Sequence, residues 1–81
     1  KMEGEVIDSR LVSYSVRTIL LSENKWFRVR AITDKLSMEF RQVDRRRLAR
    51  IISITLTNLM ANGHVERVKK GSVYLYRWKG F

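Results

Sequence analysis

The segment from Asp44 to Gly63 constrains the fold of this chain more than any other part of its sequence. Asp44 is a suitable N-cap, because its carboxylate can accept hydrogen bonds from the free N–H groups of a first helical turn. Gly63 can adopt the left-handed backbone that ends a helix. Between them, apolar residues recur at helical spacing, and Val43 and Leu48 are spaced as a hydrophobic staple. This pattern predicts one helix with a buried stripe of Leu48, Ile52, Thr55, Leu56 and Leu59, flanked by Ile51.

A first helix is expected over about Ser9 to Ser22, preceded by loosely ordered residues 1–7. Asp8 is a suitable N-cap for it, and Ile7 and Val12 have the spacing of a second staple. Apolar residues at helical spacing define its inward face. That face is expected to contain Val12, Ser15, Val16 and Ile19, with Leu11 and Leu20 widening it.

A short strand and a second helix are expected next. The run Lys25 to Val29 has strand character, and apolar residues at helical spacing then predict a helix over about Arg30 to Leu36. The connection Ser37 to Val43 leads to the long helix. Its apolar residues Met38, Phe40 and Val43 are expected to pack onto the core.

A β-hairpin is expected after Gly63. Two β-rich runs, His64 to Val68 and Val73 to Trp78, flank the segment Lys69-Lys70-Gly71-Ser72, and a glycine near the tip is typical of a hairpin turn. Both lysines would therefore lie in the turn.

Two registers of this hairpin are open. A three-residue loop would pair Val65 with Leu75 and turn Val73 and Leu75 inward. A four-residue loop would pair Val65 with Tyr76 and turn Tyr74, Tyr76 and Trp78 inward. The second register is preferred, because it buries three large aromatic side chains.

The order helix, short strand, helix, helix, hairpin resembles the winged helix-turn-helix family. Leu56, Leu59, Gly63 and Val65 match the family's junction between recognition helix and wing, and Tyr76-Arg77-Trp78 resembles its second wing strand. The family more often has a smaller aliphatic residue where this chain has tryptophan. The resemblance covers about residues 10–78. In size and basic character the chain is similar to small regulators of archaeal plasmids and viruses.

The resemblance implies an α+β fold, with one winged helix-turn-helix domain over residues 1–81. Three helices, a short strand after the first and a C-terminal β-hairpin wing would form it. The connection Ser37 to Val43 is longer than the turn of about 3–4 residues in the simplest helix-turn-helix. The resemblance identifies the fold better than the ligand, since the family also includes RNA-binding and protein-binding members.

Basic residues are concentrated in the last two thirds of the chain. The sequence holds 17 Lys and Arg against 8 Asp and Glu, a net charge of +9. Residues 1–24 hold 3 basic and 4 acidic residues, whereas residues 25–81 hold 14 and 4. A charge needed only for solubility has no reason to avoid the first third, so a polyanion partner is expected.

The predicted long helix has a polar row opposite its apolar stripe. At about 100° per residue, Arg46, Arg50, Ser53 and Thr57 fall on the outward side. Arginine can donate two hydrogen bonds to guanine, and short hydroxyls can bond bases or phosphates. Asp44 is the only acid between Gln42 and Gly63. We therefore expect a regulator that reads the major groove of double-stranded DNA with Arg46, Arg47, Arg50, Ser53, Ile54 and Thr57.

Further basic residues are candidates for contacts to the DNA backbone. Lys69 and Lys70 would place positive charge on the wing, about residues 67–73, where it can meet the backbone or the minor groove. Contacts to phosphate position a protein without reading sequence. The other phosphate candidates are Arg28, Arg30, Arg41 and Arg45.

Catalysis, metals and cofactors have no support in the sequence. With His64 as its one histidine and no cysteine, the chain offers neither a zinc site nor a nucleophile–histidine pair. The glycines, at positions 4, 63, 71 and 80, form no phosphate-binding loop. A protein that is not an enzyme and takes no metal, cofactor or small-molecule ligand is expected.

The remaining expectations concern location and partners. No window reaches the roughly 18 apolar residues of a membrane span, so no membrane partner is expected. The expected location is the cytoplasm, in association with the nucleoid when the protein is bound to DNA. A homodimer through the weakly charged first helix is a further expectation, with Tyr14 as a core-edge residue or dimer contact. The alternative function is a winged-helix module that binds structured RNA or a protein assembly.

Overall fold

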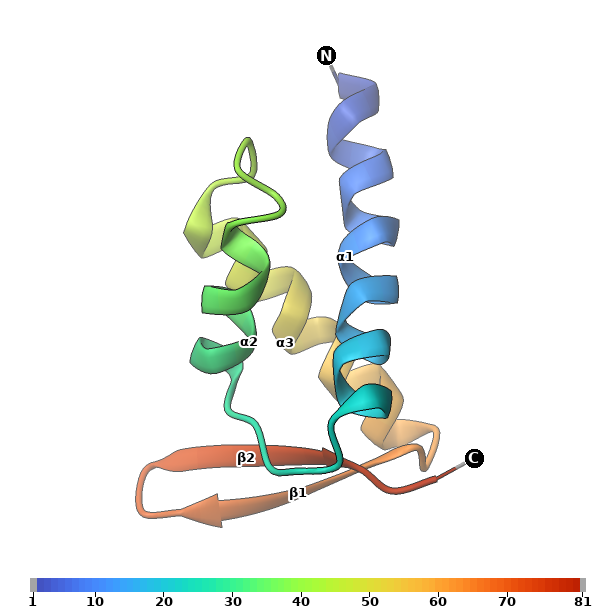
Figure 1. Cartoon of the computed structure of the whole chain (residues 1–81), viewed down its shortest axis with the longest axis vertical. Helices are drawn as coiled ribbons and strands as arrows, with labels where there is room; N and C mark the ends of the chain where they lie inside the picture. The colour runs from blue at the N-terminus through green and yellow to red at the C-terminus, as the bar shows by residue number, and fades with distance from the viewer. Residues whose placement is uncertain (1, 81) are drawn as a thin grey trace.

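The structure, a computed structural model, describes residues 2–80 and the side chains of residues 9–80. Three helices precede a C-terminal antiparallel hairpin, an α+β fold compatible with a winged-helix layout (Figure 1). The elements are α1 (Met2–Ser22), α2 (Val29–Ser37), α3 (Arg45–Ala61), β1 (Val65–Lys70) and β2 (Val73–Trp78). Within the described residues, no helix is long and apolar enough to cross a membrane.

The third helix begins and ends where the sequence predicts. The Asp44 carboxylate accepts a hydrogen bond from the Arg47 backbone N–H, at 3.3 Å. At the other end Gly63 has φ +83°, and its N–H donates to the Met60 carbonyl at 3.0 Å. The next N–H, of His64, donates to the Leu59 carbonyl at 2.9 Å, which completes a Schellman motif.

The core lies between the helices and the inner face of the hairpin. The whole predicted stripe of α3 is buried, and its one polar member, Thr55, is fully hydrogen-bonded. The Thr55 hydroxyl donates to the Ile51 carbonyl at 2.8 Å, so it accepts the proton of the Ser13 hydroxyl of α1, also at 2.8 Å. The apolar core residues are Val12, Val16, Leu20, Phe27, Ile32, Leu36, Phe40, Leu48, Ile52, Leu56, Leu59, Val65 and Tyr76.

The first helix starts earlier than expected. It begins at Met2, so Asp8 lies inside it and is not its N-cap, and residues 2–7 are helical rather than loosely ordered. Residue 1 lies outside the described part of the chain. Methionine and glutamate are good helix formers, and acidic residues are favourable near a helix N-terminus. These preferences outweigh the capping signal of a single aspartate.

One expected member of the inward face of α1 is exposed. Val12, Val16 and Leu20 are buried as predicted, but Leu11 is 48% exposed. Leu11 precedes Val12 by one residue and is turned by about 100° from it, which takes it out of the buried face.

The short strand after α1 is a single bridge. The backbones of Phe27 and Tyr76 exchange two hydrogen bonds of 2.7 Å each, which adds Phe27 to the edge of the hairpin along β2. The expected strand from Lys25 to Val29 is thus reduced to one residue, because Val29 already begins α2.

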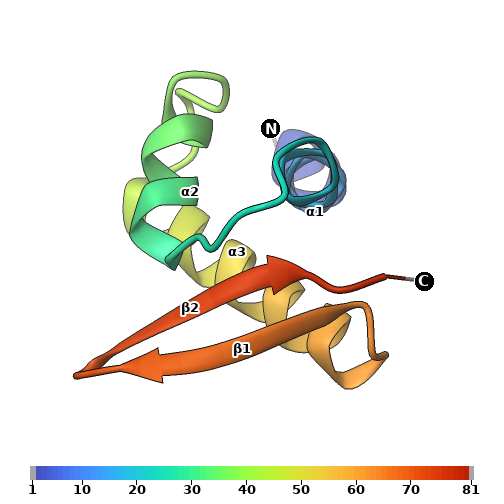
Figure 2. The same ribbon diagram turned by 60° about the horizontal axis from the view of Figure 1, so that its bottom comes forward.

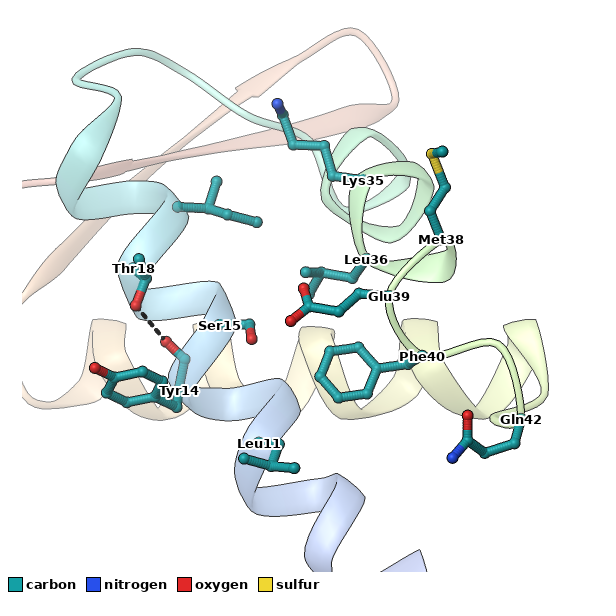
Figure 3. A pocket seen from close by; sticks show the side chains of 11 residues that line it. Leu11, Tyr14, Ser15, Thr18, Lys35, Leu36, Met38, Glu39, Phe40 and Gln42 are labelled. Atoms are coloured by element: carbon teal, nitrogen blue, oxygen red, sulfur yellow. Dashed lines mark hydrogen bonds between the residues drawn. The ribbon is translucent and has the colours of Figure 1, made fainter.

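The connection between α2 and α3 packs onto the core in part. Phe40 is buried and Val43 packs against the core as predicted. Met38 is 74% exposed, so its predicted burial is wrong. It lies in the turn directly after α2, and its side chain points away from the Phe40 ring, which is directed toward α1 (Figure 3).

Neither expected hairpin register is correct. β1 pairs with β2 so that Val65 lies opposite Trp78 and Lys70 opposite Val73, with Gly71-Ser72 as a two-residue loop. Gly71 has φ +63°, and glycine at the first loop position is typical of a type II′ turn, whose twist matches that of the strands. The tight turn therefore assigns Lys69 and Lys70 to β1.

The hairpin extends past the helices that cover its inner face. Its tip projects beyond α2 in both views, while its other end packs against α3 and α1 (Figures 1 and 2). Tyr76 is buried and Trp78 packs against the core, as predicted. Tyr74 shares their face but lies near the tip and is exposed, so its predicted burial is wrong.

Candidate nucleic-acid interface

The outward side of α3 is a continuous exposed row. Arg46, Arg47, Arg50 and Thr57 are exposed, Ser53 is half-buried, and Ile54 is 53% exposed. The buried residues of α3, which pack against the core, lie on the opposite side of the helix. The six residues predicted from the sequence are thus brought together on one face.

Two arginines of this face have no acidic partner among residues 9–80. Within residues 9–80, neither Arg46 nor Arg50 forms an ion pair or hydrogen bond through its side chain. Asp44, the acid nearest in the sequence, accepts a hydrogen bond from the first turn of α3. Both guanidinium groups are therefore available to an anion or to a base edge.

A shallow groove lies at the start of this face, between α3 and α1. It is lined by Ser9 of α1 and, from the α3 side, by Asp44, Arg46, Arg47, Arg50 and Ile51. Arg46 and Arg50 lie near the positive end of the helix dipole, which repels cations. An anionic oxygen in the groove would lower this repulsion.

The hydroxyl of Thr57 has a defined role in hydrogen bonding. It donates to the Ser53 carbonyl of its own helix, at 3.0 Å. Its remaining lone pairs can only accept, so in this rotamer Thr57 suits a donor such as the exocyclic amine of adenine or cytosine. A phosphate oxygen, which needs a donor, would require the hydroxyl to rotate.

Arg45 has an acidic partner in α2. Its guanidinium forms an ion pair with the Asp34 carboxylate, and both side chains are more than half exposed. Such an exposed pair is worth about 0–1 kcal/mol, so a phosphate can compete for the arginine. Arg45 is therefore a weaker phosphate candidate than Arg46 or Arg50.

The arginines around α2 are exposed but dispersed. Arg28 precedes the first turn of α2, and Arg41 lies beyond its other end, in the connection to α3. Arg30 lines a shallow groove with Val29, Thr33, Arg45 and Ala49, between α2 and α3. The fold thus brings Arg30 and Arg45 together and places Arg28 and Arg41 at opposite ends of α2.

The two wing lysines lie on opposite faces of the hairpin. Both are exposed at the end of β1, but Lys69 pairs with Tyr74 and Lys70 with Val73. Because successive strand residues alternate between faces, only Lys69 shares the inner face of the hairpin.

Sequence reasoning missed two residues on that inner face. The guanidinium of Arg67 lies over the Tyr74 ring at 4.2 Å from its centroid, and the Lys69 ammonium lies 5.8 Å from the same centroid. The cations hold an exposed aromatic ring between them near the tip of the wing. Only the correct hairpin register predicts that these three side chains lie together, and the sequence left that register open.

Other aromatic and titratable side chains have structural partners. Arg77 stacks on Trp26 at 4.5 Å and forms an ion pair with Glu66 at 2.7 Å, so its charge is offset. His64 stacks on Trp78, with ring centroids 5.6 Å apart, and its Nδ1 is 3.1 Å from the Gly80 carbonyl. Among the residues whose positions are described, no three His, Cys, Asp or Glu side chains gather as a metal site would need.

In comparisons with known proteins, no family model, no curated protein and no solved structure matched this chain. The candidate interface therefore rests on the chain's own residues: the α3 row and the Arg67–Tyr74–Lys69 cluster of the hairpin.

Proposed function

We propose that this chain is a winged helix-turn-helix protein that binds double-stranded DNA, with α3 in the major groove and the hairpin against the backbone or the minor groove. The observation that carries the proposal is the exposed α3 row, in which Arg46 and Arg50 have no acidic partner among residues 9–80. An ordinary solvated helix face mixes charges of both signs, whereas the first turn of α3 contains no acid.

The chemistry of the row suits a base-reading helix. The major groove is about 12 Å wide and admits one α-helix. Arginine can bond guanine O6 and N7, Thr57 can accept from an exocyclic amine, and the exposed methyl groups of Ile54 can contact the thymine methyl. The short side chains of Ser53 and Thr57, which follow the arginines along the row, let the helix backbone approach the base edges.

The layout around α3 supports a winged helix. α2 and α3 lie against each other across the connection and would be the two helices of the helix-turn-helix. The Phe27–Tyr76 bridge ties the segment after α1 to β2, which fixes the hairpin beside α3. The projecting tip, with Arg67 and Lys69, would then serve as the wing. A transcription regulator is the role that such a domain fits.

Structured RNA is the alternative ligand that a test must separate from duplex DNA. The major groove of A-form RNA is deep and narrow, and side chains of a helix cannot reach its base edges. The row on α3 is therefore better matched to B-form DNA.

Competition at physiological salt distinguishes the two ligands. A fluorescent random-sequence duplex is bound to the protein, and its anisotropy is followed as unlabelled duplex DNA or hairpin RNA of equal charge is added. The proposal predicts that duplex DNA displaces the probe at lower concentration than RNA does. Equal or stronger competition by RNA would favour the RNA-binding alternative, and no binding to either would remove the proposal.

A further inference from the structure

The first helix has a second apolar side that the core does not use. Leu11, Tyr14 and Leu21 are 48%, 71% and 45% exposed, on the side of α1 opposite the buried Val12, Val16 and Leu20. With Thr18 they recur at alternating spacings of three and four residues. This spacing is typical of a helix that packs along another helix.

Part of this exposed stripe borders an open groove. Leu11, Tyr14 and Thr18 line it on the α1 side, and Met38 and Glu39 lie on the opposite wall, in and next to the connection between α2 and α3 (Figure 3). The Phe40 ring points into the groove from that side. The groove has a volume of about 880 Å³, and Met38 and Tyr14 are the most exposed large apolar side chains in the described part of the chain.

The charges of helix and groove are complementary. Arg10 and Arg17 flank the stripe at helical spacing from Tyr14 and Leu21, and both are exposed. On the groove wall, Glu39 is exposed and has no ion-pair partner among residues 9–80, whereas Lys35 is already paired with Glu23 at 3.4 Å. The groove therefore contains one acidic side chain and the helix contains two basic side chains. None of the three has an ion-pair partner within residues 9–80.

We propose that two copies of this chain pair through this surface, with the α1 of each copy seated in the groove of the other. A twofold interface needs a self-complementary patch. This patch supplies both halves, because an apolar helix flanked by arginines lies next to an apolar groove with an exposed glutamate. DNA does not fit the groove, since its walls are apolar and its uncompensated charge is negative.

The shape of α1 agrees with this arrangement. At about 1.5 Å per residue its 21 residues span roughly 30 Å, and its first turns extend past every other element (Figure 1). Isolated helices are marginal in water, so a second copy alongside would add contacts that stabilise this one. None of the six residues of the α3 row lines the groove, so the pairing leaves them available to DNA.

Sedimentation equilibrium without DNA tests the pairing. The wild-type mass is expected to rise from that of one chain to that of two as concentration increases. Tyr14→Lys should raise the dimer dissociation constant at least about tenfold, because it puts a charge at the centre of the interface. Val68→Lys, which adds the same charge at an exposed apolar position of the hairpin, should leave it unchanged. A wild-type chain that stays monomeric, or equal dimerisation of Tyr14→Lys, would overturn the proposal.

A charge exchange identifies the occupant of the groove. Arg17→Glu and Glu39→Arg should each weaken dimerisation, and the double variant should restore at least half of the loss, because the pair is re-formed with its signs exchanged. Restoration in the double variant requires a second copy of α1 in the groove, and its absence would reject that occupant. Unchanged melting curves of the variants show that the fold is retained. Since no DNA is present, failure here is distinct from failure of duplex binding.

Discussion

Single side chains of α3 decide whether this helix can read a base. Arg46 and Arg50 are one helical turn apart on the outward side, and neither is held by an acidic partner in the described structure. A guanidinium without a partner gives up no internal ion pair when it binds guanine. By contrast, Arg45 must first leave Asp34. We therefore expect Arg46 and Arg50 to contact bases and Arg45 to contact at most a phosphate.

Replacement of Arg50 should weaken specific DNA binding. Arg50→Ala removes two potential hydrogen bonds to guanine, and we expect a loss of about 1–3 kcal/mol in binding free energy on a preferred duplex. The dissociation constant is measured by anisotropy at fixed salt. Lys25→Ala removes the same charge from the connection between α1 and α2 and should have little effect. Equal losses in the two variants would mean that only net charge matters.

Replacement of Asp44 should lower stability. Its carboxylate is the only side-chain cap that the structure describes on α3, and Asp44→Ala should cost about 1 kcal/mol in the free energy of unfolding, measured by urea denaturation. Asp34→Ala, which removes only the exposed pair with Arg45, should cost less. The reverse order would argue against the cap.

At the scale of elements, the hairpin carries a cationic cluster on one face only. Arg67, Lys69 and Tyr74 lie together near its tip, and Val68 lies on the opposite face. If this cluster meets the DNA backbone, its two cations release counterions on binding, whereas the opposite face does not.

Removing both cations should flatten the salt dependence of binding. For the Arg67→Ala, Lys69→Ala double variant, the slope of log K against log salt should fall by about 0.9 for each phosphate that the hairpin no longer neutralises. Val68→Thr, a neutral change on the other face, should keep the wild-type slope. An unchanged slope in the double variant would place the hairpin away from the backbone.

Helix α3 could be predicted from the sequence because its signals are local. Its cap, its stripe and its glycine stop lie within twenty consecutive residues, and they agree with one another. The outward row followed from helical geometry alone. The start of α1 could not be predicted in this way, since the capping preference of Asp8 competed with good helix formers before it.

The predictions that were wrong concern features that depend on packing between distant segments. The register was wrong because burial of Tyr74 was favoured over the two-residue turn at Gly71, and only the full fold shows that the tip projects beyond any core. For the same reason the Arg67–Tyr74 stack was missed. Burial of Met38 was overestimated, because of these two residues only Phe40 is turned toward the core.

For the whole molecule, the distribution of charge separates two surfaces. The last 57 residues contain 14 of the 17 basic residues, and the outward side of α3 and the wing belong to them. The α1 groove lies on the other side of α3 and carries Glu39, which has no ion-pair partner within residues 9–80. A basic surface for a polyanion and a nearly neutral surface for a second copy can therefore be occupied together.

Paired copies should bind DNA sites with repeated halves. If two α3 helices enter successive major grooves on one side of the duplex, half-sites lie about 10 base pairs or a multiple of that apart. Footprinting on a preferred duplex measures the spacing. Tyr14→Lys should protect a single half at concentrations at which the wild type protects both, and protection of both halves by this variant would contradict the coupling.

Selection of bound duplexes from a random DNA pool tests the central claim most directly. The wild-type chain should enrich a defined motif that contains guanine, and the Arg46→Ala, Arg50→Ala double variant should lose preference at those guanines while it still binds DNA weakly. If the double variant enriches the same motif as the wild type, or if the wild type enriches none, α3 does not read the major groove.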